Sequence, residues 1–149
     1  MTSARMNWPC REFSFGSPDY RNSLRLREEV LRKPLGLPLA AEDVAGENES
    51  YHLGCFQEDR LVGSLILKPV DETTLRMRQV AVAPDTQGKG AGSDLIQFAE
   101  EFARGKGYRT IIAHARQQFF QFYIKRGYGI RGGPFIELTI PHYAIFKQL

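Results

Sequence analysis

The stretch VAVAPDTQGKGAGS, residues 80–93, largely decides how this chain folds. Its first three residues are apolar without alternation, which is typical of a strand end buried on both faces. Residues 88–92 then contain three glycines, and residues 91–103 repeat apolar side chains at helical spacing. The stretch therefore predicts a strand that leads into a glycine-rich turn, and the turn opens a helix.

The glycine-rich turn has the properties of an anion-binding site. Backbone N–H groups in the first turn of a helix lack partners within the helix and carry the positive end of its dipole. Glycines let a large anion approach this backbone closely, and Lys89 adds a positive charge. We expect a phosphate group to bind here. The competing interpretation is a flexible turn whose glycines only permit tight packing.

Two nucleotide-binding patterns fit this turn poorly. A P-loop requires Ser or Thr after its Gly-Lys pair, whereas Gly88-Lys89 is followed by Gly90. A dinucleotide fingerprint requires glycine where the sequence has Ser93, and no acidic residue lies near 110–113 to hold a ribose. The sequence therefore disfavours ATP and NAD as ligands.

The rest of the chain alternates between strand and helix patterns. Apolar runs predict strands at residues 11–15, 51–56, 60–68, 74–82, 108–113, 135–140 and 143–146. Helices are predicted at 18–32, with Ser17 as N-cap, and at 91–103 and 117–126, ending near Pro34, Gly105 and Gly127. The order β-α-βββ-α-β-α-ββ indicates an α+β domain on one mixed sheet.

The composition fits a single globular domain over residues 1–149. Hydrophobic residues make up 42% and charged residues 25%, which excludes a disordered, collagen-like or coiled-coil chain. The 20 Lys+Arg and 17 Asp+Glu residues leave a formal charge of +3. This mild excess suits an anionic ligand, and no interleaved basic and aromatic pattern indicates nucleic acid.

The sequence also predicts where the protein acts. No apolar run approaches the ~20 residues of a membrane helix, so we expect no membrane partner. Residues 1–12 lack the apolar core of a signal peptide, which predicts a cytoplasmic protein. Cys10 and Cys55 are expected to be free thiols, and no CxxC indicates a metal. Exposed late strands could pair between two copies as a homodimer.

The pattern Gln87-x-x-Gly90-x-Gly92 after Val80-Ala81-Val82 resembles the acetyl-CoA loop of the GCN5-related N-acetyltransferase (GNAT) family. That loop reads Q/R-x-x-G-x-G/A after a V-A-V-x-P strand end. The resemblance implies a central, mostly antiparallel sheet splayed between its fourth and fifth strands, with flanking helices. It implies that Val80, Ala81 and Val82 bind the pantetheine and the thioester carbonyl through their backbone. It places the CoA pyrophosphate on Gln87, Gly88, Lys89, Gly90, Ala91, Gly92 and Ser93.

A second motif, Phe122-Tyr123-x-x-x-Gly127-Tyr128, looks like the family's F/L-Y-x-x-x-G-F/Y. The family's tyrosine often protonates the departing CoA thiolate, which implies that role for Tyr123. The alternative is a tyrosine that only fills the core face of a helix.

A third resemblance is to a bacterial subgroup with an [N/H]-A-R segment and an E-x-x-I-P-H ending. Here these read His114-Ala-Arg116 and Glu137-Leu-Thr-Ile-Pro-His142, and the resemblance spans about residues 22–147. Arg116 stands where many relatives have an Asn that contacts CoA. Phe119 replaces a small residue and would narrow the pantetheine channel. Gln87 stands where Arg is commoner.

The general base is left open by the sequence. Some relatives place a Glu on the strand before the loop, but this strand has Arg76, Met77 and Arg78. His114, Glu137 and His142 are the candidates, and each could instead serve a structural role. We predict that Glu137 or His142 orients the acceptor or takes its proton, and that the backbone N–H of Val82 stabilises the carbonyl oxygen.

These features predict an enzyme that moves acetyl from acetyl-CoA to a primary amine of a small molecule by direct attack in a ternary complex. The apolar loop 33–39 could form one wall of the acceptor pocket or simply cover the core. Lys89, Arg116, Lys125 and Arg126 could contact the CoA phosphates or be solvated surface charges. Two alternatives stay open: a CoA-binding sensor without turnover, and an acetyltransferase for protein N-termini or lysines.

Overall fold

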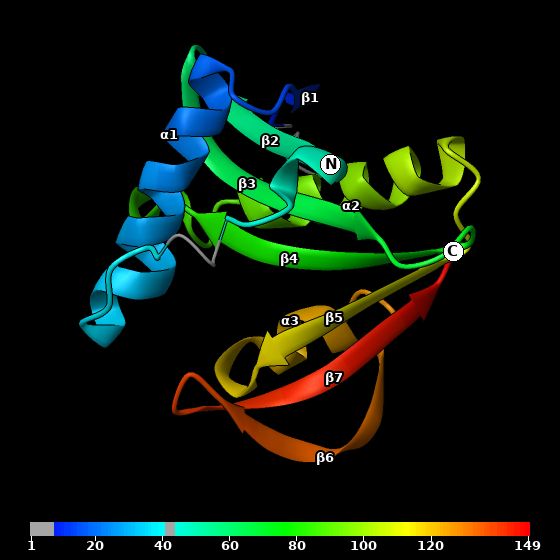
Figure 1. The fold of residues 1–149 in the computed structure, drawn as a ribbon. Helices are drawn as coiled ribbons and strands as arrows, with labels where there is room; N and C mark the ends of the chain where they lie inside the picture. Colours follow the sequence, from blue (N-terminus) through cyan, green and yellow to red (C-terminus); the bar gives the residue numbers. More distant parts are fainter. Residues whose placement is uncertain (1–7, 41–43) are drawn as a thin grey trace, which may run out of the picture.

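A computed structural model describes residues 8–40 and 44–149, which build one seven-stranded mixed sheet (Figure 1). The spatial order of the strands is β1-β2-β3-β4-β5-β7-β6. β4 and β5 run parallel, and the other neighbouring strands run antiparallel. The strands are β1 (Cys10–Phe13), β2 (Tyr51–Gln57), β3 (Arg60–Pro69), β4 (Thr74–Val82), β5 (Thr110–Arg116), β6 (Gly129–Glu137) and β7 (Ile140–Gln148).

Helices cover both faces of this sheet. α1 (Pro18–Arg27) begins at Ser17, whose hydroxyl accepts from the Tyr20 amide at 3.2 Å, so the predicted N-cap is confirmed. It continues through a π-helical turn (Glu28–Arg32) and a 3-10 turn (Lys33–Leu35). α2 (Ala91–Gly105) and α3 (Phe120–Ile124) pack on the face opposite to α1 (Figure 1). The predicted α+β fold and its order of strands and helices are confirmed.

The main core lies between the sheet and α2. The fully buried Leu53, Leu75, Leu95, Ala99 and Ile111 belong to it. Free thiols Cys10 and Cys55 lie opposite each other in β1 and β2. Because α2 presents its apolar side chains at helical spacing, this packing fixes the start of α2 against the end of β4.

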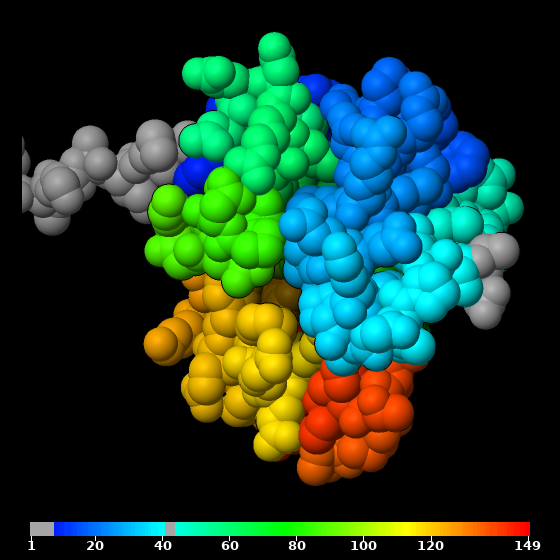
Figure 2. Space-filling view, turned by 90° about the vertical axis from the view of Figure 1, so that its left-hand side faces the viewer, coloured from blue at the N-terminus to red at the C-terminus, as the bar shows by residue number. Residues whose placement is uncertain are grey.

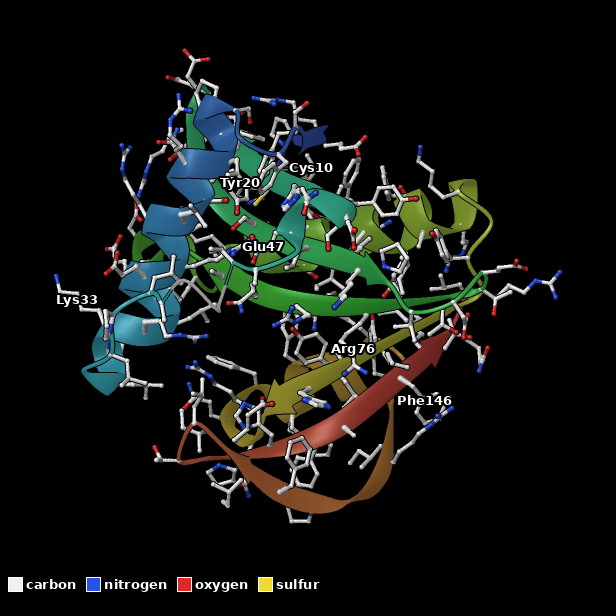
Figure 3. All side chains as sticks on the ribbon, in the orientation of Figure 1. Cys10, Tyr20, Lys33, Glu47, Arg76 and Phe146 are labelled. Atoms are coloured by element: carbon white, nitrogen blue, oxygen red, sulfur yellow. The ribbon has the colours of Figure 1, made fainter. Side chains whose placement is uncertain are left out.

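A buried ion pair connects α1 to the segment around Glu47, which precedes β2. The Arg27 guanidinium donates to both carboxylate oxygens of Glu47, at 2.9 and 2.8 Å, and both side chains are 1% exposed. The Tyr20 hydroxyl donates to the same carboxylate at 2.8 Å, and Figure 3 shows Tyr20 and Glu47 directed toward each other. His52 contacts the Glu47 backbone carbonyl at 2.7 Å and is 2% exposed, so it belongs to this buried network.

Several predicted boundaries were wrong. The predicted end of α2 near Gly105 is confirmed, but the glycine that closes the helix with positive φ is Gly107 (φ of 92°), after which the Tyr108 amide donates to the Ala103 carbonyl. Strand β5 runs two residues later than predicted, and α3 is preceded by a 3-10 turn (Gln117–Phe119). The last hairpin turns at Leu138 and Thr139, which both have positive φ, instead of between residues 140 and 143.

Candidate active site

The site forms where two neighbouring strands of the sheet separate. β4 pairs with β5 from Thr74 to Met77. Beyond this point β4 follows β3 as far as Val82, and β5 follows β7 as far as Arg116. The two strands therefore diverge, which confirms the expected splay between the fourth and fifth strands.

A bulge in β4 lies at the point of divergence. Gln79 has φ of 55°, and the register with β3 shifts between Ser64 and Ile66. A left-handed conformation is uncommon for a residue with a side chain, and bulges bend a strand and often lie beside active sites. The expected burial of residues 80–82 on both faces was wrong, because only Ala81 is buried. The divergence of β5 leaves Val80 and Val82 partly exposed.

The opening between the strands contains a cavity of about 630 Å³. Side chains from both faces of the sheet line it, including His114 and Arg116 on the α1 face and Tyr123 from α3 on the other. Figure 2 shows the surface hollowed between the end of β4, α1 and the segment around residues 110–120. The opening therefore passes through the sheet.

The backbone of Val82 faces this opening. The Ala83 amide donates to the Val62 carbonyl of β3 at 2.8 Å, and Val82 lies opposite Gly63. Because amides alternate in direction along a strand, the Val82 N–H is directed away from β3. Val80 shares this direction and lines the cavity. Ala81 alternates with them, so its amide is directed at β3 instead of at the opening, and the structure does not favour the binding role predicted for it.

The glycine-rich loop joins the end of β4 to α2. Gly88 and Gly90 have φ of 77° and 96°, a region that other residues rarely adopt, and Gly90 is the N-cap of α2. The side-chain amide of Gln87 donates to the Val82 carbonyl at 2.9 Å, and the Trp8 indole donates to the Lys89 carbonyl at 3.1 Å. These contacts hold the loop over the first turn of α2, where Ala91, Gly92 and Ser93 lie.

Of the four cations predicted near the loop, Arg126 lies at the start of α2. Its guanidinium donates to the Ser93 hydroxyl at 2.6 and 3.1 Å and stacks over the Phe122 ring, 3.6 Å from the centroid. Lys89 and Lys125 are exposed. Arg116 lies on the α1 face, where it donates to the Leu31 carbonyl at 3.0 Å, so it lines the cavity instead of the loop.

Tyr123 lies in the wall of the cavity and is 8% exposed. Its ring packs against Phe122 and Tyr128 in edge-to-face geometry. Burial raises the pKa of Tyr123 to about 12, since the phenolate would lose its hydration. The hydroxyl therefore keeps its proton at neutral pH and is a proton donor next to the opening.

The predicted acid–base residues converge at the opposite side of the cavity. Glu137 Oε1 lies 3.3 Å from His114 Nδ1, and Glu137 Oε2 lies 3.6 Å from His142 Nε2. The other nitrogen of His142, Nδ1, lies 2.8 Å from the Ile140 carbonyl, an acceptor that requires a proton on Nδ1. Strands β5, β6 and β7 thus bring Glu137 next to His114, which precedes it by 23 residues, and next to His142.

Phe135 completes this group, and sequence reasoning missed it. Its ring stacks on His142, with centroids 5.8 Å apart, and meets the edge of His114 at 4.9 Å. Phe135 lies directly opposite His142 in the β6–β7 pairing. The only signal in the sequence is its spacing of two residues from Glu137, which places both on one face of a strand.

Residues 5–128 match the profile of the acetyltransferase (GNAT) family. The chain belongs to this family.

Individual relatives agree with the GNAT assignment. The chain is 27% identical over 129 residues to YjcF of Bacillus subtilis, named as an uncharacterized N-acetyltransferase, which covers 86% of this chain and 91% of YjcF. A crystal structure from Lactobacillus plantarum, provisionally described as an N-acetyltransferase, is 26% identical with a TM-score of 0.84, covering 97% of this chain and 99% of that one. A GNAT acetyltransferase from Elizabethkingia anophelis with acetyl-CoA bound shares the fold at 18% identity, with a TM-score of 0.75 and coverage of 96% and 99%.

Of two features that were predicted for the cavity wall, Phe119 and loop 33–39, only Phe119 lines the cavity. Phe119 lines it but is 47% exposed. The wall toward α1 comes from Leu31 and Arg32, whereas residues 33–39 supply no lining side chain and Leu37 is exposed. Of the two interpretations of loop 33–39, the structure does not support a wall of this cavity.

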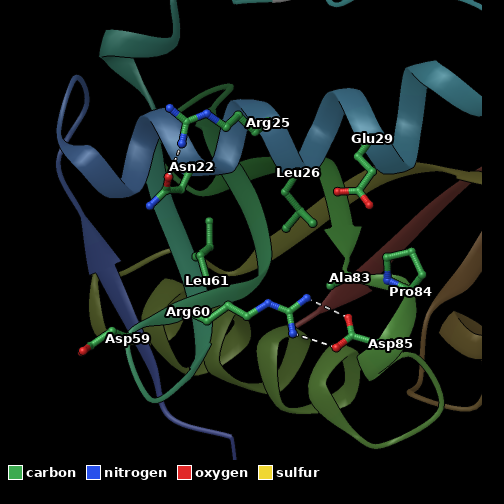
Figure 4. Close-up of a pocket in the computed structure, with 10 residues that line it drawn as sticks. All are labelled: Asn22, Arg25, Leu26, Glu29, Asp59, Arg60, Leu61, Ala83, Pro84 and Asp85. Atoms are coloured by element: carbon green, nitrogen blue, oxygen red, sulfur yellow. Dashed lines mark hydrogen bonds and ion pairs between the residues drawn. The ribbon is translucent and has the colours of Figure 1, made fainter.

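A second cavity, of about 540 Å³, lies between α1 and the β2–β3 turn (Figure 4). The Arg60 guanidinium donates to both oxygens of Asp85 at 2.7 and 2.8 Å across it. The neighbouring Arg25 donates to the Asn22 side-chain oxygen at 2.9 Å. Because these polar groups already satisfy one another, we place the reaction in the cavity between β4 and β5.

The described residues contain no cluster of three His, Cys, Asp or Glu side chains suited to a metal ion. No helix within residues 8–40 and 44–149 is long and apolar enough to cross a membrane.

Proposed function

We propose that this protein transfers an acetyl group from acetyl-CoA to the primary amine of a small molecule, by direct attack in a ternary complex. The observation that supports this function most is the opening through the sheet between β4 and β5. On one side of it lie the glycine-rich loop and Tyr123, and on the other the group His114, Glu137 and His142. The cytoplasm is the proposed location.

The loop and its surroundings fit acetyl-CoA. The first-turn amides of the 15-residue helix α2, together with Gly88 and Gly90, offer donors to a pyrophosphate, and Arg126 adds a positive charge beside Ser93. We assign the pantetheine to the backbone of Val80 and Val82, which face the opening. When bound, acetyl-CoA supplies the activated acetyl group.

The chain's own residues divide the chemistry between them. The acceptor arrives as an ammonium ion with a pKa near ~10, so the group around Glu137 must take one proton before the nitrogen can attack. The Val82 N–H stabilises the negative charge that develops on the carbonyl oxygen. As the C–N bond forms and the C–S bond breaks, Tyr123 donates its proton to the departing sulfur. The attacking nitrogen then loses its second proton to water, and the Tyr123 phenolate takes a proton back from water, which restores the enzyme.

The absence of a carboxylate on β4 favours a binding protein without turnover, which is the second candidate. Glu137 weakens that alternative, because it supplies a carboxylate from β6 with two histidines in contact. Tyr123, which lines the same opening, supplies a proton donor that ligand binding alone does not require.

The first test is an isothermal titration of the purified protein with acetyl-CoA, with ATP and NAD as controls. We expect saturable binding of acetyl-CoA alone. Steady release of CoA thiol with an added amine, from a panel of amino acids, amino sugars and polyamines, would then establish turnover. Equal binding of all three nucleotides would reduce the loop to a generic anion site, and acetyl-CoA binding with no thiol release would favour the binding protein.

A further inference from the structure

The acceptor side of the cavity is lined by more positive than negative charge. Of the residues that line it, one is a carboxylate, Glu137. Five are cations from four different elements of the fold: Arg32, Lys68, Arg76, Arg78 and Arg116. This excess of positive charge would repel the ammonium groups of a simple amine or a polyamine.

The strand register places three of these cations on one face of the sheet. Lys68 lies opposite Arg76 in the β3–β4 pairing, and Arg78 follows Arg76 by two residues. Side chains directly opposite on neighbouring strands have Cβ atoms about 5 Å apart. Arg78 is also opposite Ile66, which is itself opposite His52 on the face that α1 covers. Figure 3 shows Arg76 beside β5.

These three cations have no partner of opposite charge in the structure. Within the described part of the chain, no carboxylate forms an ion pair with Lys68, Arg76 or Arg78. By contrast, Arg11, Arg27, Arg60 and Lys147 each pair with an acidic side chain. Lys68, Arg76 and Arg78 are therefore available to bind an anionic ligand.

The pKa of Arg116, on β5, is affected by the same excess of positive charge. Burial lowers its pKa, and the neighbouring Arg32 lowers it further, while Glu137 acts in the opposite direction. An anion placed between the two strands would relieve this repulsion.

Three of the cations lie on the wall of the cavity opposite to Glu137. The cations Lys68, Arg76 and Arg78 belong to β3 and β4, whereas Glu137 and His142 belong to β6 and β7. A molecule with one charge of each sign has a single favourable orientation in such a cavity. Its acidic group faces β4, and its ammonium group faces the carboxylate that we propose takes its proton.

We propose that the acceptor is a small amine that also carries an acidic group, a carboxylate or a phosphate, which Arg76, Arg78 and Lys68 bind. This inference rests on the proposed acetyltransferase function and names the class of its acceptor. The CoA phosphates do not explain these cations, because the glycine-rich loop starts α2, and α2 packs on the opposite face of the sheet.

The test compares acceptors that share one primary amine and differ in the second group. The second group is a carboxylate in β-alanine and a phosphate in 2-aminoethyl phosphate. It is an uncharged amide in β-alanine amide and a second ammonium group in 1,3-diaminopropane. We expect one or both acids to have a kcat/KM about ten-fold to a hundred-fold above the amide, since each charge-assisted hydrogen bond contributes this much. The two acids tell which acidic group fits. An amide or diamine that reacts as well as both acids would overturn the inference.

Variants locate the effect. Arg78→Gln and Arg76→Gln should lower kcat/KM for the acid acceptor about ten-fold each and leave the KM for acetyl-CoA and the rate with the amide nearly unchanged. Arg109→Gln, an exposed cation outside the cavity, is the matched control and should change neither. Thermal unfolding followed by circular dichroism confirms that each variant is folded. Equal loss for acid and amide would mean that Arg76 and Arg78 only support the structure.

Failure of this inference is distinguishable from failure of the proposed function. If neutral amines or diamines are acetylated and acids are not preferred, the enzyme remains an acetyltransferase and the inference is wrong. If acetyl-CoA binds and none of the four amines, nor any of the wider amine panel, releases thiol, both are wrong.

Discussion

Tyr123 is suited to donate a proton because its burial keeps the hydroxyl protonated. Its pKa is raised to about 12, so the acid form predominates below that pH and is lost only above it. We predict that Tyr123→Phe lowers kcat about a hundred-fold, the lower range for one general acid, with the Kd for acetyl-CoA unchanged. The wild-type rate should show no loss from Tyr123 ionisation between pH 7 and 10.

Tyr108→Phe is the control for this variant, since Tyr108 contacts Tyr51 away from the cavity. Steady-state kinetics and titration with acetyl-CoA measure the two quantities separately. A Tyr123→Phe enzyme with full kcat would leave the tyrosine with only its packing role against Phe122 and Tyr128.

Glu137 lies between His114 and His142, so its replacement together with that of His142 should change both the rate and its dependence on pH. We predict that Glu137→Gln together with His142→Gln lowers kcat/KM for the acceptor about a hundred-fold at pH 7, and that raising the pH recovers part of the loss. The recovery follows because a larger fraction of the free amine is neutral near its own pKa.

The matched control for the double variant is Glu101→Gln, which changes an exposed carboxylate on α2. Rates measured from pH 6 to 10 distinguish the loss of the general base, which higher pH partly restores, from a loss of folded protein, which higher pH does not restore. Unchanged acetyl transfer in the double variant, at equal thermal stability, would remove the acid–base role of this group.

At the scale of elements, the loop before α2 requires glycine at its N-cap. Gly90 has φ of 96°, so an added Cβ is strained there by about 1–2 kcal/mol, and a side chain would also obstruct a pyrophosphate. We predict that Gly90→Ala raises the Kd for acetyl-CoA at least ten-fold, as measured by titration. Gly133→Ala in β6, where open space surrounds the backbone and φ is not positive, is the control and should bind normally.

The buried pair of Arg27 and Glu47 holds α1 to the segment that precedes β2. We predict that Glu47→Ala lowers the free energy of unfolding by about 3–5 kcal/mol, because Arg27 stays buried without its partner. Urea unfolding followed by circular dichroism measures this change. The comparison is Asp85→Ala, which breaks the exposed pair with Arg60 and should change stability little. Equal losses in both variants would contradict the role of burial.

The sequence predicts those parts of the site that short sequence motifs and regular apolar spacing indicate. The strand, turn and helix at residues 80–103 follow from spacing alone, and the family motifs point to Tyr123, Glu137 and His142. The pairing of Lys68 with Arg76 was not predictable, because the sequence pattern does not fix the register between β3 and β4. The bulge at Gln79 was not predictable either. Nor was the last turn, since Leu138 and Thr139 are unusual residues at positive φ.

The whole molecule presents positive charge on both faces of the sheet, with Arg126 beside the loop and Arg76 and Arg78 beside the acceptor cavity. β6 is an edge strand with Ile136 69% exposed, and its pairing with a second copy stays a prediction. The edge position of β6 follows from the order of the strands, because β7 lies between β5 and β6.

The charge near the loop should make acetyl-CoA binding depend on salt. Exposed charges are screened over about 8–10 Å at 0.1–0.15 M ionic strength and over about 3 Å at 1 M. We predict that the Kd for acetyl-CoA rises between 0.05 and ~0.5 M NaCl, and that Arg126→Gln raises the Kd at low salt and flattens this rise. Arg109→Gln, which removes the same charge from an exposed position away from the loop, should keep the wild-type dependence. A salt dependence equal in all three proteins would mean that the backbone amides of the loop hold the phosphates without help from Arg126.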